Sequence, residues 1–228
     1  MLFEDRSFKL ILDIAKSRPR ADHSVEQYLM TGESLYIQLG LFKRVVSRGQ
    51  VLFLGDDDHF SIVSALYTDI KPTVLEIDDR VIKSLRKVSR KCNLTDYTVI
   101  KHDIRSTSQS IKQGHFDCVV ANPPYSSKNK AYGIKLWISR GLYYLKKGGV
   151  LLLILPMDRA LPWSISNILI AQAFLVSNRC FLFDVDGDAH TYKDLPDIGL
   201  RSCNFWCFYM GGATNLFPNL RPGENPYR

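Results

Sequence analysis

The chain has 228 residues, a length that suits one ordinary domain or one domain with a small appendage. Hydrophobic residues make up 46% and charged residues 23%, which is typical of globular proteins and excludes a disordered or fibrous chain. No apolar run approaches the roughly 18 residues that a membrane span needs. The N-terminus carries acids where a secretory signal would be basic. We therefore expect an intracellular protein, cytoplasmic or associated with the nucleoid or nucleus, that makes no contact with a membrane.

The basic residues are unevenly distributed. The net charge is +7, and residues 126–160 alone hold seven basic residues and one acid, Asp158. Such a local excess favours a polyanionic partner, with nucleic acid as the first candidate. A solvated helix face remains the plainer alternative. The cysteines predict neither a disulfide framework nor a zinc site, because they are five in number and scattered, at Cys92, Cys118, Cys180, Cys203 and Cys207. We expect core cysteines and no bound metal.

The first fifty residues read as helices. Phe8, Ile11 and Ile14 lie on one helical stripe, and a second helix is expected over residues 33–48, with Gly49 placed to end it. After Gly49 the helical spacing of apolar residues ends. Short, continuous apolar runs follow, which are typical of buried parallel strands. These runs cover residues 51–54, 73–77, 97–100, 116–120 and 150–155.

Helical patterns separate most of these runs, at residues 80–91 and 136–145. Strands that alternate with helices predict a doubly wound α/β sheet. A further apolar helix is expected over residues 165–176, followed by strands at 179–185 and 202–210, which we expect to form an antiparallel pair at the sheet edge. The expected division is an N-terminal helical extension over residues 1–49, an α/β domain over 50–212, and a loose proline-containing tail over 213–228.

Acids follow the first three predicted strands, at the end of a doubly wound sheet where ligands bind. Gly55-Asp56-Asp57-Asp58 follows the first strand, Glu76 ends the second, and Asp103 follows the third. Glu76 lies about twenty residues beyond Gly55, a spacing that suits a ribose diol. A carboxylate at Asp103 can accept from the amino group of adenine. Acids at strand ends are also common as helix N-caps. A single acid is therefore a weak signal, and it is the order and spacing of all of them together that indicates a nucleoside site.

The fourth predicted strand runs into Asn122-Pro123-Pro124-Tyr125. The two prolines fix the chain direction and keep Asn122 out of the helical region. The Asn122 side chain and the Pro123 carbonyl can then accept hydrogen bonds from one amino group, and Tyr125 can stack on a planar substrate. Acceptors placed in this way aim the lone pair of a weakly nucleophilic amino nitrogen at an electrophile. A proline-containing turn without chemistry is the alternative.

This Asn-Pro-Pro-Tyr segment resembles the signature of amino-group methyltransferases that use S-adenosylmethionine. The resemblance extends over residues 50–156, and to about 211 with the edge strands. It implies a mostly parallel, seven-stranded, Rossmann-like methyltransferase sheet with an antiparallel edge strand, and catalysis by Asn122, Pro123, Pro124 and Tyr125. It also implies that S-adenosylmethionine contacts Leu54, Gly55, Asp56, Asp57, Glu76, Ile77, Asp103, Ile104 and Asn122.

The first cofactor motif departs from this family, in which it is rich in glycine. Gly55-Asp-Asp-Asp58 resembles the branched-chain polyamine synthases, which transfer aminopropyl groups from decarboxylated S-adenosylmethionine. Upstream, Glu26-Gln27-Tyr28, followed by Thr31 and Glu33, faintly resembles a segment of the same family. Those synthases carry Asp before their two prolines, whereas this chain has Asn122. They also bind a cation, which the basic segment after the motif would repel.

The sequence thus leads to one main hypothesis and two alternatives. The main one is methyl transfer to an exocyclic amino nitrogen, adenine N6 or cytosine N4, in DNA or RNA. Phosphates would be held by four basic side chains, Lys128, Lys130, Lys135 and Arg140. With little length left for target recognition, a partner subunit is one option. The alternatives are aminopropyl transfer that makes branched polyamines, and a noncatalytic subunit with a methyltransferase fold. The sequence does not decide the base, the polymer or the oligomeric state.

Overall fold

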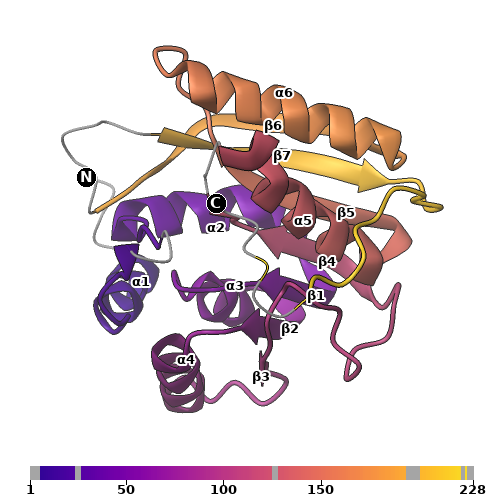
Figure 1. The fold of residues 1–228 in the computed structure, drawn as a ribbon. Coiled ribbons are helices and arrows are strands. Elements are labelled where there is room, and N and C mark those ends of the chain that lie inside the picture. Colours follow the sequence, from indigo (N-terminus) through magenta and orange to yellow (C-terminus); the bar gives the residue numbers. More distant parts are fainter. Residues whose placement is uncertain (1–5, 24–26, 125–127, 194–200, 222–223, 225–228) are drawn as a thin grey trace.

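A seven-stranded sheet forms the centre of the molecule (Figure 1). The computed structural model describes residues 6–23, 27–124, 128–193, 201–221 and 224, and the side chains of 128–131 are not among the described parts. The strand order is β3-β2-β1-β4-β5-β7-β6. The strands are β1 (Arg48–Leu54), β2 (Asp69–Glu76), β3 (Thr98–Lys101), β4 (Phe116–Ala121), β5 (Leu145–Pro156), β6 (Cys180–Thr191) and β7 (Arg201–Tyr209).

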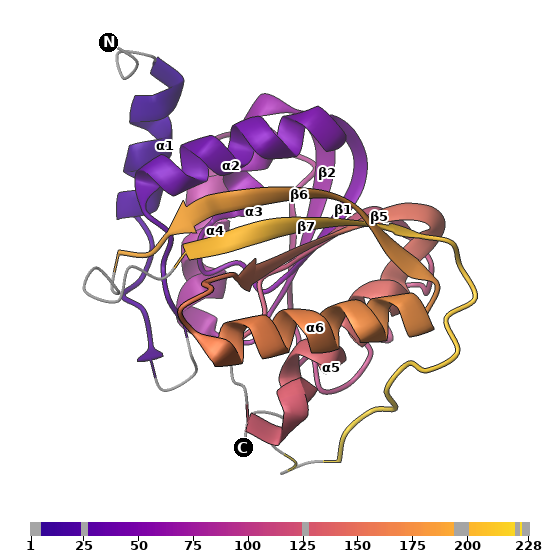
Figure 2. The same ribbon diagram turned by 90° about the horizontal axis from the view of Figure 1, so that it is seen from above.

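Helices cover both faces of this sheet. They are α1 (Arg6–Lys16), α2 (Gly32–Val45), α3 (Phe60–Tyr67), α4 (Asp79–Lys91), α5 (Lys128–Tyr144) and α6 (Pro162–Ser177). One hydrophobic core lies under α1 to α4 and a second under α5 and α6, and Figure 2 shows α2 and α6 on opposite sides of the sheet. Side chains alternate along a strand, so Val51 and Phe53 of β1 enter the first core while Leu52 and Leu54 enter the second.

The expected fold class is confirmed. β1, β2, β3, β4 and β5 are parallel, and β7 alone runs against its neighbours, since it pairs antiparallel with both β5 and β6. The antiparallel strand therefore lies one position inside the sheet, and β6 forms the edge. β6 is longer than expected and carries two register shifts, between Leu182 and Asp184 and between Asp186 and His190.

Two local predictions were wrong. The second helix ends at Val45 instead of at Arg48, and Gly49 belongs to β1. Gly49 has φ +110°, and a Cβ there would lie 2.8 Å from the Asp117 carboxylate, so this glycine serves strand packing. Helix α3 was not expected at all. Its sequence is short and almost entirely apolar, a composition that a buried strand shares.

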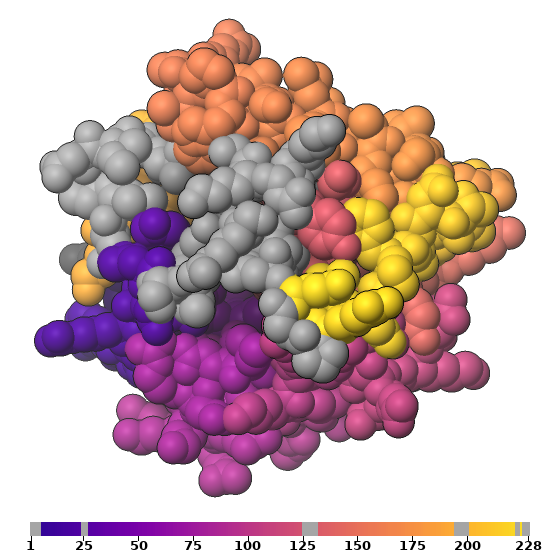
Figure 3. Space-filling model, in the orientation of Figure 1, coloured from indigo at the N-terminus to yellow at the C-terminus, as the bar shows by residue number. Residues whose placement is uncertain are grey.

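The C-terminal tail, as far as the structure describes it, is not the loose segment that the sequence predicts. Its described part, drawn in yellow, lies against the surface of the domain (Figure 3), and hydrogen bonds tie Phe217, Asn219 and Leu220 to α5 and to the loop after β3. At the other end, α1 and α2 share the first core with β1. The division at residues 49 and 212 stays a prediction. No helix in the described part of the chain is long and apolar enough to span a membrane.

Candidate active site

A cavity of about 390 Å³ opens at the carboxyl ends of the parallel strands, where ligands bind in sheets of this kind. It brings together most of the residues that the sequence singled out. Those in its wall are Gly55, Asp56, Asp57, Glu76, Ile77, Asp103, Ile104, Asn122, Pro123 and Pro124. Leu54 is not in the wall, because its side chain is buried in the core under α5. No group of acidic, histidine or cysteine side chains among the described residues could hold a metal ion.

Gly55 makes the sharp turn that follows β1. Its φ is +66°, a conformation that side chains disfavour. A Cβ at this position would also lie 3.0 Å from the Trp137 ring. Trp137 comes from α5 and lines the cavity, so the glycine lets the backbone pass beneath an aromatic wall.

The three aspartates after Gly55 have three different environments. Asp56 turns away toward α3: it accepts hydrogen bonds from the backbone N–H groups of Phe60, at 2.8 Å, and Ser61, at 3.1 Å, and from the Ser61 hydroxyl. Its carboxylate therefore satisfies the first two N–H groups of α3, whose N-cap residue His59 offers no side-chain hydrogen bond. Burial raises the pKa of Asp56 well above its usual value, against the lowering effect of these hydrogen bonds.

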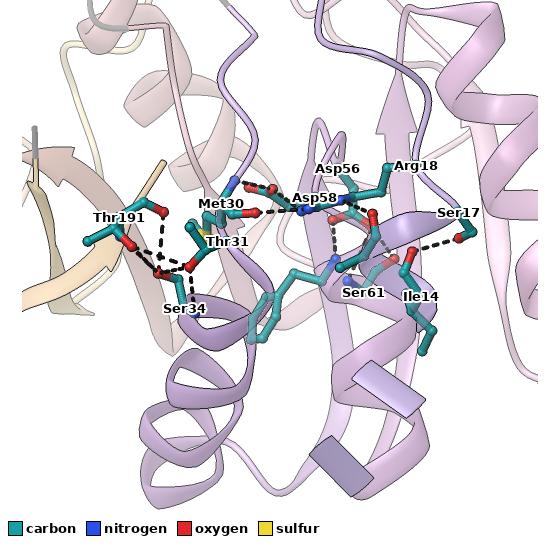
Figure 4. A network of polar contacts seen from close by, with 12 residues as sticks. Ile14, Ser17, Arg18, Met30, Thr31, Ser34, Asp56, Asp58, Ser61 and Thr191 are labelled. Carbon is teal, nitrogen blue, oxygen red and sulfur yellow. Dashed lines mark hydrogen bonds and ion pairs between the residues drawn. The ribbon is translucent and has the colours of Figure 1, made fainter. Parts of the chain in front are cut away.

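Asp58 is held from the other side. Its Oδ1 accepts from Arg18 Nη1 and from the Met30 backbone N–H, both at 2.8 Å, as Figure 4 shows. Arg18 also donates to the carbonyls of Ala15 and Met30. The side chains of both ion-pair partners are at most 5% exposed. This buried pair ties the N-terminal segment to the turn after β1.

Asp57 differs from both neighbours. It is half-buried in the cavity wall, and no described residue donates a hydrogen bond to its carboxylate. Burial raises its pKa well above the usual value, and the nearby carboxylates of Asp58 and Glu76 raise it further. Asp57 is thus an acid held near other acids, without a counter-ion of its own in the described part of the chain, an arrangement that attracts a cation.

Glu76 is fixed by the backbone around it. Its Oε1 accepts from the N–H groups of Ile77 and Asp78, at 2.7 and 2.9 Å, and its Oε2 accepts from the N–H of Asp56 at 3.0 Å. Oε2 keeps a free lone pair for a ligand hydroxyl. Burial raises the pKa of Glu76 even so. The carboxylate joins the ends of β1 and β2 and is already aimed at the cavity.

At the far side of the cavity Asp103 has a partner. Arg105 donates its backbone N–H to Oδ1, at 2.9 Å, and its guanidinium to Oδ2, at 2.8 and 2.5 Å. Burial acts to raise the pKa of Asp103, but the hydrogen bonds from Arg105 outweigh it and the pKa is lowered. Asp103 therefore lines the cavity as a charged carboxylate whose charge is balanced by Arg105.

The proline turn reaches the cavity as well. β4 ends at Ala121, and Asn122, Pro123 and Pro124 follow it into the wall. Tyr125 lies outside the described residues. The turn and the acids therefore share one site, although whether Asn122 and the prolines contact a substrate stays a prediction.

The basic segment does not match the expected phosphate site. Arg140 is 1% exposed and donates to backbone carbonyls inside the protein, so its assignment to a phosphate contact was wrong. Lys135 lies about 6 Å from the ring centres of Tyr132 and Phe217 and is not in the cavity wall. The side chains of Lys128 and Lys130 fall outside the described parts. A count of charges along the sequence cannot distinguish an internal arginine from a surface one.

Part of the wall comes from residues that the sequence did not single out. Gln27, Tyr28 and Met30 reach the cavity from the segment before α2, and Trp137 reaches it from α5. The only sequence signal for the first group was the faint resemblance around Gln27 to the polyamine synthases. Nothing in the local sequence marked Arg18, whose role depends on a contact across 40 residues.

Comparisons with known proteins agree on one family. The family model of the branched-chain polyamine synthase A C-terminal domain matches residues 7–195. An N(4)-bis(aminopropyl)spermidine synthase from Methanocaldococcus jannaschii is 33% identical over 140 residues, which are 59% of this chain and 38% of that protein. An uncharacterized protein of the same organism is 35% identical over 139 residues, 60% of this chain and 34% of that protein. The chain thus matches little more than a third of the length of these relatives.

Solved structures share the fold. The branched-chain polyamine synthase from Thermus thermophilus, in complex with N4-aminopropylspermidine and 5'-methylthioadenosine, has a TM-score of 0.82 and 20% identity, over 98% of this chain and 68% of that one. TrmN from Thermus thermophilus has a TM-score of 0.57 and 15% identity, over 77% of this chain and 48% of that one. At these identities the likeness extends to the fold alone.

These comparisons overturn the main functional hypothesis. Methyl transfer to a base of DNA or RNA, and with it nucleic-acid binding, was wrong, because the family model and the named curated relatives point to polyamine synthases. The Gly-Asp-Asp-Asp turn was the informative motif, and the departure from a glycine-rich motif was the signal. Of the expected methyltransferase features, the comparisons support the Rossmann-like methyltransferase fold and not the amino-group methyltransferase family.

Proposed function

The chain belongs to the family of the branched-chain polyamine synthase A C-terminal domain, and on that premise we propose that it is an aminopropyltransferase. The donor would be decarboxylated S-adenosylmethionine and the acceptor an amino nitrogen of a linear polyamine. Two curated relatives are named N(4)-bis(aminopropyl)spermidine synthase. Because the chain spans only part of their length, the activity of the whole relatives is carried over here as a proposal.

The observation that carries the proposal is the free carboxylate of Asp57 in the cavity wall. No described residue donates a hydrogen bond to it, while Asp56 and Asp58 on either side are engaged by α3 and by Arg18. A polyamine is cationic at neutral pH, and a half-buried acid without a counter-ion is a favourable partner for an ammonium group.

The same acids favour one form of the donor. S-adenosylmethionine carries an α-carboxylate, and Asp56, Asp57 and Glu76 would lie near it in the wall of one cavity. Like charges in a partly buried site repel one another. The decarboxylated donor has lost that carboxylate and ends in an ammonium group, which the acids attract. Electrostatics thus support the aminopropyl donor over the methyl donor.

The proposed step is a displacement at carbon. The lone pair of the acceptor nitrogen attacks the propyl carbon bound to the sulfonium, the new C–N bond forms, and the C–S bond breaks with its electrons passing to sulfur. 5'-Methylthioadenosine leaves. The proton of the acceptor nitrogen passes to the Asp57 carboxylate, whose raised pKa suits a base. Asn122 and the Pro123 carbonyl would orient the acceptor, and Glu76 would hold the ribose.

The adenine end of the donor would lie at the other side of the cavity. Ile77, Asp103 and Ile104 line this part, and Oδ1 of Asp103 keeps a lone pair for the adenine amino group after accepting from Arg105. Binding energy from this non-reacting part of the donor would position the sulfonium near Asp57.

The test is a product assay with matched donors. The purified protein is incubated with spermidine and either decarboxylated S-adenosylmethionine or S-adenosylmethionine, and chromatography with mass detection follows 5'-methylthioadenosine and the amine product. We expect both products only with the decarboxylated donor, and a mass gain of one aminopropyl group on the amine. Release of S-adenosylhomocysteine from the second donor, or no turnover with spermidine and longer linear polyamines, would overturn the proposal.

A further inference from the structure

Arg140 in α5 is a buried guanidinium that serves neither catalysis nor a surface charge. It is 1% exposed, and no carboxylate in the described part of the chain forms an ion pair with it. Instead it donates to four backbone carbonyls: those of Ile104 and Arg105, both at 2.9 Å, Phe217 at 2.7 Å and Pro218 at 2.8 Å. A buried charge is tolerated only when its hydrogen bonds are made, and here they are divided between two segments.

The first of these segments is the loop after β3. Asp103, Ile104 and Arg105 of this loop line the cavity. β3 is a strand of four residues at the sheet edge and pairs with β2 alone, and none of its residues is buried. Such an edge supplies little packing to hold a loop in one conformation, so the loop depends on contacts from elsewhere.

The second segment is the C-terminal one, residues 217–220, and its other contacts reach the same loop and α5. The Leu220 N–H donates to the Arg105 carbonyl at 2.8 Å, and the Thr107 N–H donates to Asn219 Oδ1 at 2.8 Å. The Phe217 N–H donates to the Ser139 hydroxyl of α5 at 2.7 Å. The Phe217 ring also stacks on Tyr132, with 4.7 Å between ring centres.

We propose that Arg140 and residues 217–220 form a clamp that fixes the 103–107 loop and so positions the adenine nucleoside of the donor. The clamp acts through the loop backbone and does not touch the reacting atoms, so Arg140 is a positioning residue. The inference rests on the proposed function only in taking the cavity for the nucleoside site. It also gives the C-terminal segment a role that its proline-rich sequence did not predict.

Two single substitutions in the C-terminal tail, one inside the clamp and one just before it, give a matched test. Asn219→Ala removes the acceptor for the Thr107 N–H, whereas Asn215→Ala removes a side chain that contacts the end of α6. Calorimetry with 5'-methylthioadenosine should show about threefold weaker binding for Asn219→Ala, the size of one lost hydrogen bond, and unchanged binding for Asn215→Ala. Equal affinities in both variants would overturn the clamp.

Removal of residues 213–228 is the stronger variant and separates positioning from chemistry. We expect the KM for decarboxylated S-adenosylmethionine to rise at least tenfold and kcat to stay within about twofold. The corresponding peptide, added in trans, should restore part of the donor affinity. A loss confined to kcat, or an unchanged KM in a folded truncation, would contradict the clamp. Arg140→Lys keeps the charge but not the fork of donors and should fall between wild type and the truncation.

Hydrogen exchange keeps the clamp testable if the proposed function fails. In the unliganded truncation, the amides of residues 104–107 should exchange at least tenfold faster, while those of β1 and β4 stay protected as in the full chain. Wild-type protein that binds no 5'-methylthioadenosine would refute the nucleoside site, but faster exchange would still support a clamp on the loop. Unchanged exchange in this loop would overturn the clamp even where the nucleoside binds.

Discussion

The turn after β1 and the loop after β3 place acids at opposite sides of one cavity, yet the two sites differ in character. Asp103 is neutralised by Arg105, two residues further along the chain. Among the described residues Asp57 has no such partner, and Arg18, which approaches the same turn, binds Asp58. An acid at a strand end is therefore available to a cationic ligand only where no nearby arginine has already paired with it.

Among the variants that distinguish the two acids, Asp57→Asn should have the largest effect. The substitution removes the proposed base and cation partner, so we expect kcat/KM for aminopropyl transfer to fall by a factor of about 10² to 10⁴. Steady-state release of 5'-methylthioadenosine gives the measurement. Asp184→Asn, on the exposed part of β6, is the control and should retain wild-type rates. Activity that survives Asp57→Asn would remove this residue from the chemistry.

Loss of the buried ion pair between Arg18 and Asp58 should have the next largest effect, on the stability of the fold. Arg18→Met leaves Asp58 buried without its counter-ion, which should lower the free energy of unfolding by about 3–5 kcal/mol. Urea denaturation measures this. Arg44→Met breaks an ion pair with Asp186 in which Arg44 is 55% exposed, and here we expect about 0–1 kcal/mol. Similar losses in both variants would mean that burial does not distinguish the two pairs.

Loss of the proposed ribose contact should have a smaller effect, on ligand binding. Glu76→Ala removes the carboxylate that joins β1 to β2, and we expect about 1–3 kcal/mol weaker binding of 5'-methylthioadenosine. Asp103→Ala should weaken it less, because Arg105 already occupies most of that carboxylate. Calorimetry on both variants ranks the two sides of the cavity, and an Asp103 effect that exceeds the Glu76 effect would reverse the ranking.

The pH dependence of stability should have opposite signs at the two sites. The pKa of Asp57 is raised by burial, so its contribution to stability is complete below the unfolded value, about 3.9, and is lost as the pH rises through the folded value. The pKa of Asp103 is lowered, so its smaller contribution is present above about 3.9 and is lost on acidification through its folded value.

Thermal melts between pH 3 and pH 7 can separate these two contributions. Between pH 4 and pH 7, the melting temperature of Asp57→Asn should fall less than that of the wild type. Each kcal/mol of difference in stability corresponds to about 2–4 °C. Below pH 4, the melting temperature of Asp103→Asn should instead fall less than that of the wild type. Parallel melting curves for all three proteins would show that neither acid is linked to folding.

Much of the fold could be predicted from the sequence, because the continuous apolar runs of β1, β2 and β5 have the pattern that parallel strands produce when both faces are covered. α3 could not, since its eight apolar and serine residues carry no helical stripe. Its start depends on Asp56, and the same three-acid motif gave no sign of which carboxylate would turn toward the helix. Side-chain direction is set by tertiary contacts such as Arg18 with Asp58.

The function was misjudged for a related reason. The basic segment would repel a cationic acceptor only if every basic residue of 126–160 were a surface charge. Arg140 is internal, and Lys146 pairs with Asp117 at 2.8 Å. Local environment, not segment charge, decides what a cavity attracts. The acids of the first turn were the better guide, since they lie inside the cavity itself.

The outer strand β6 has a consequence for the behaviour of the protein at high concentration. A sheet edge of twelve residues exposes backbone donors and acceptors to which another molecule could add a strand. The two register shifts in β6 interrupt that flat template, and Asp184 and Asp188 are exposed along it. Two such edges brought together would place acids near acids. We expect this edge to resist fibre formation and aggregation, although Phe181 and Phe183 are exposed on it.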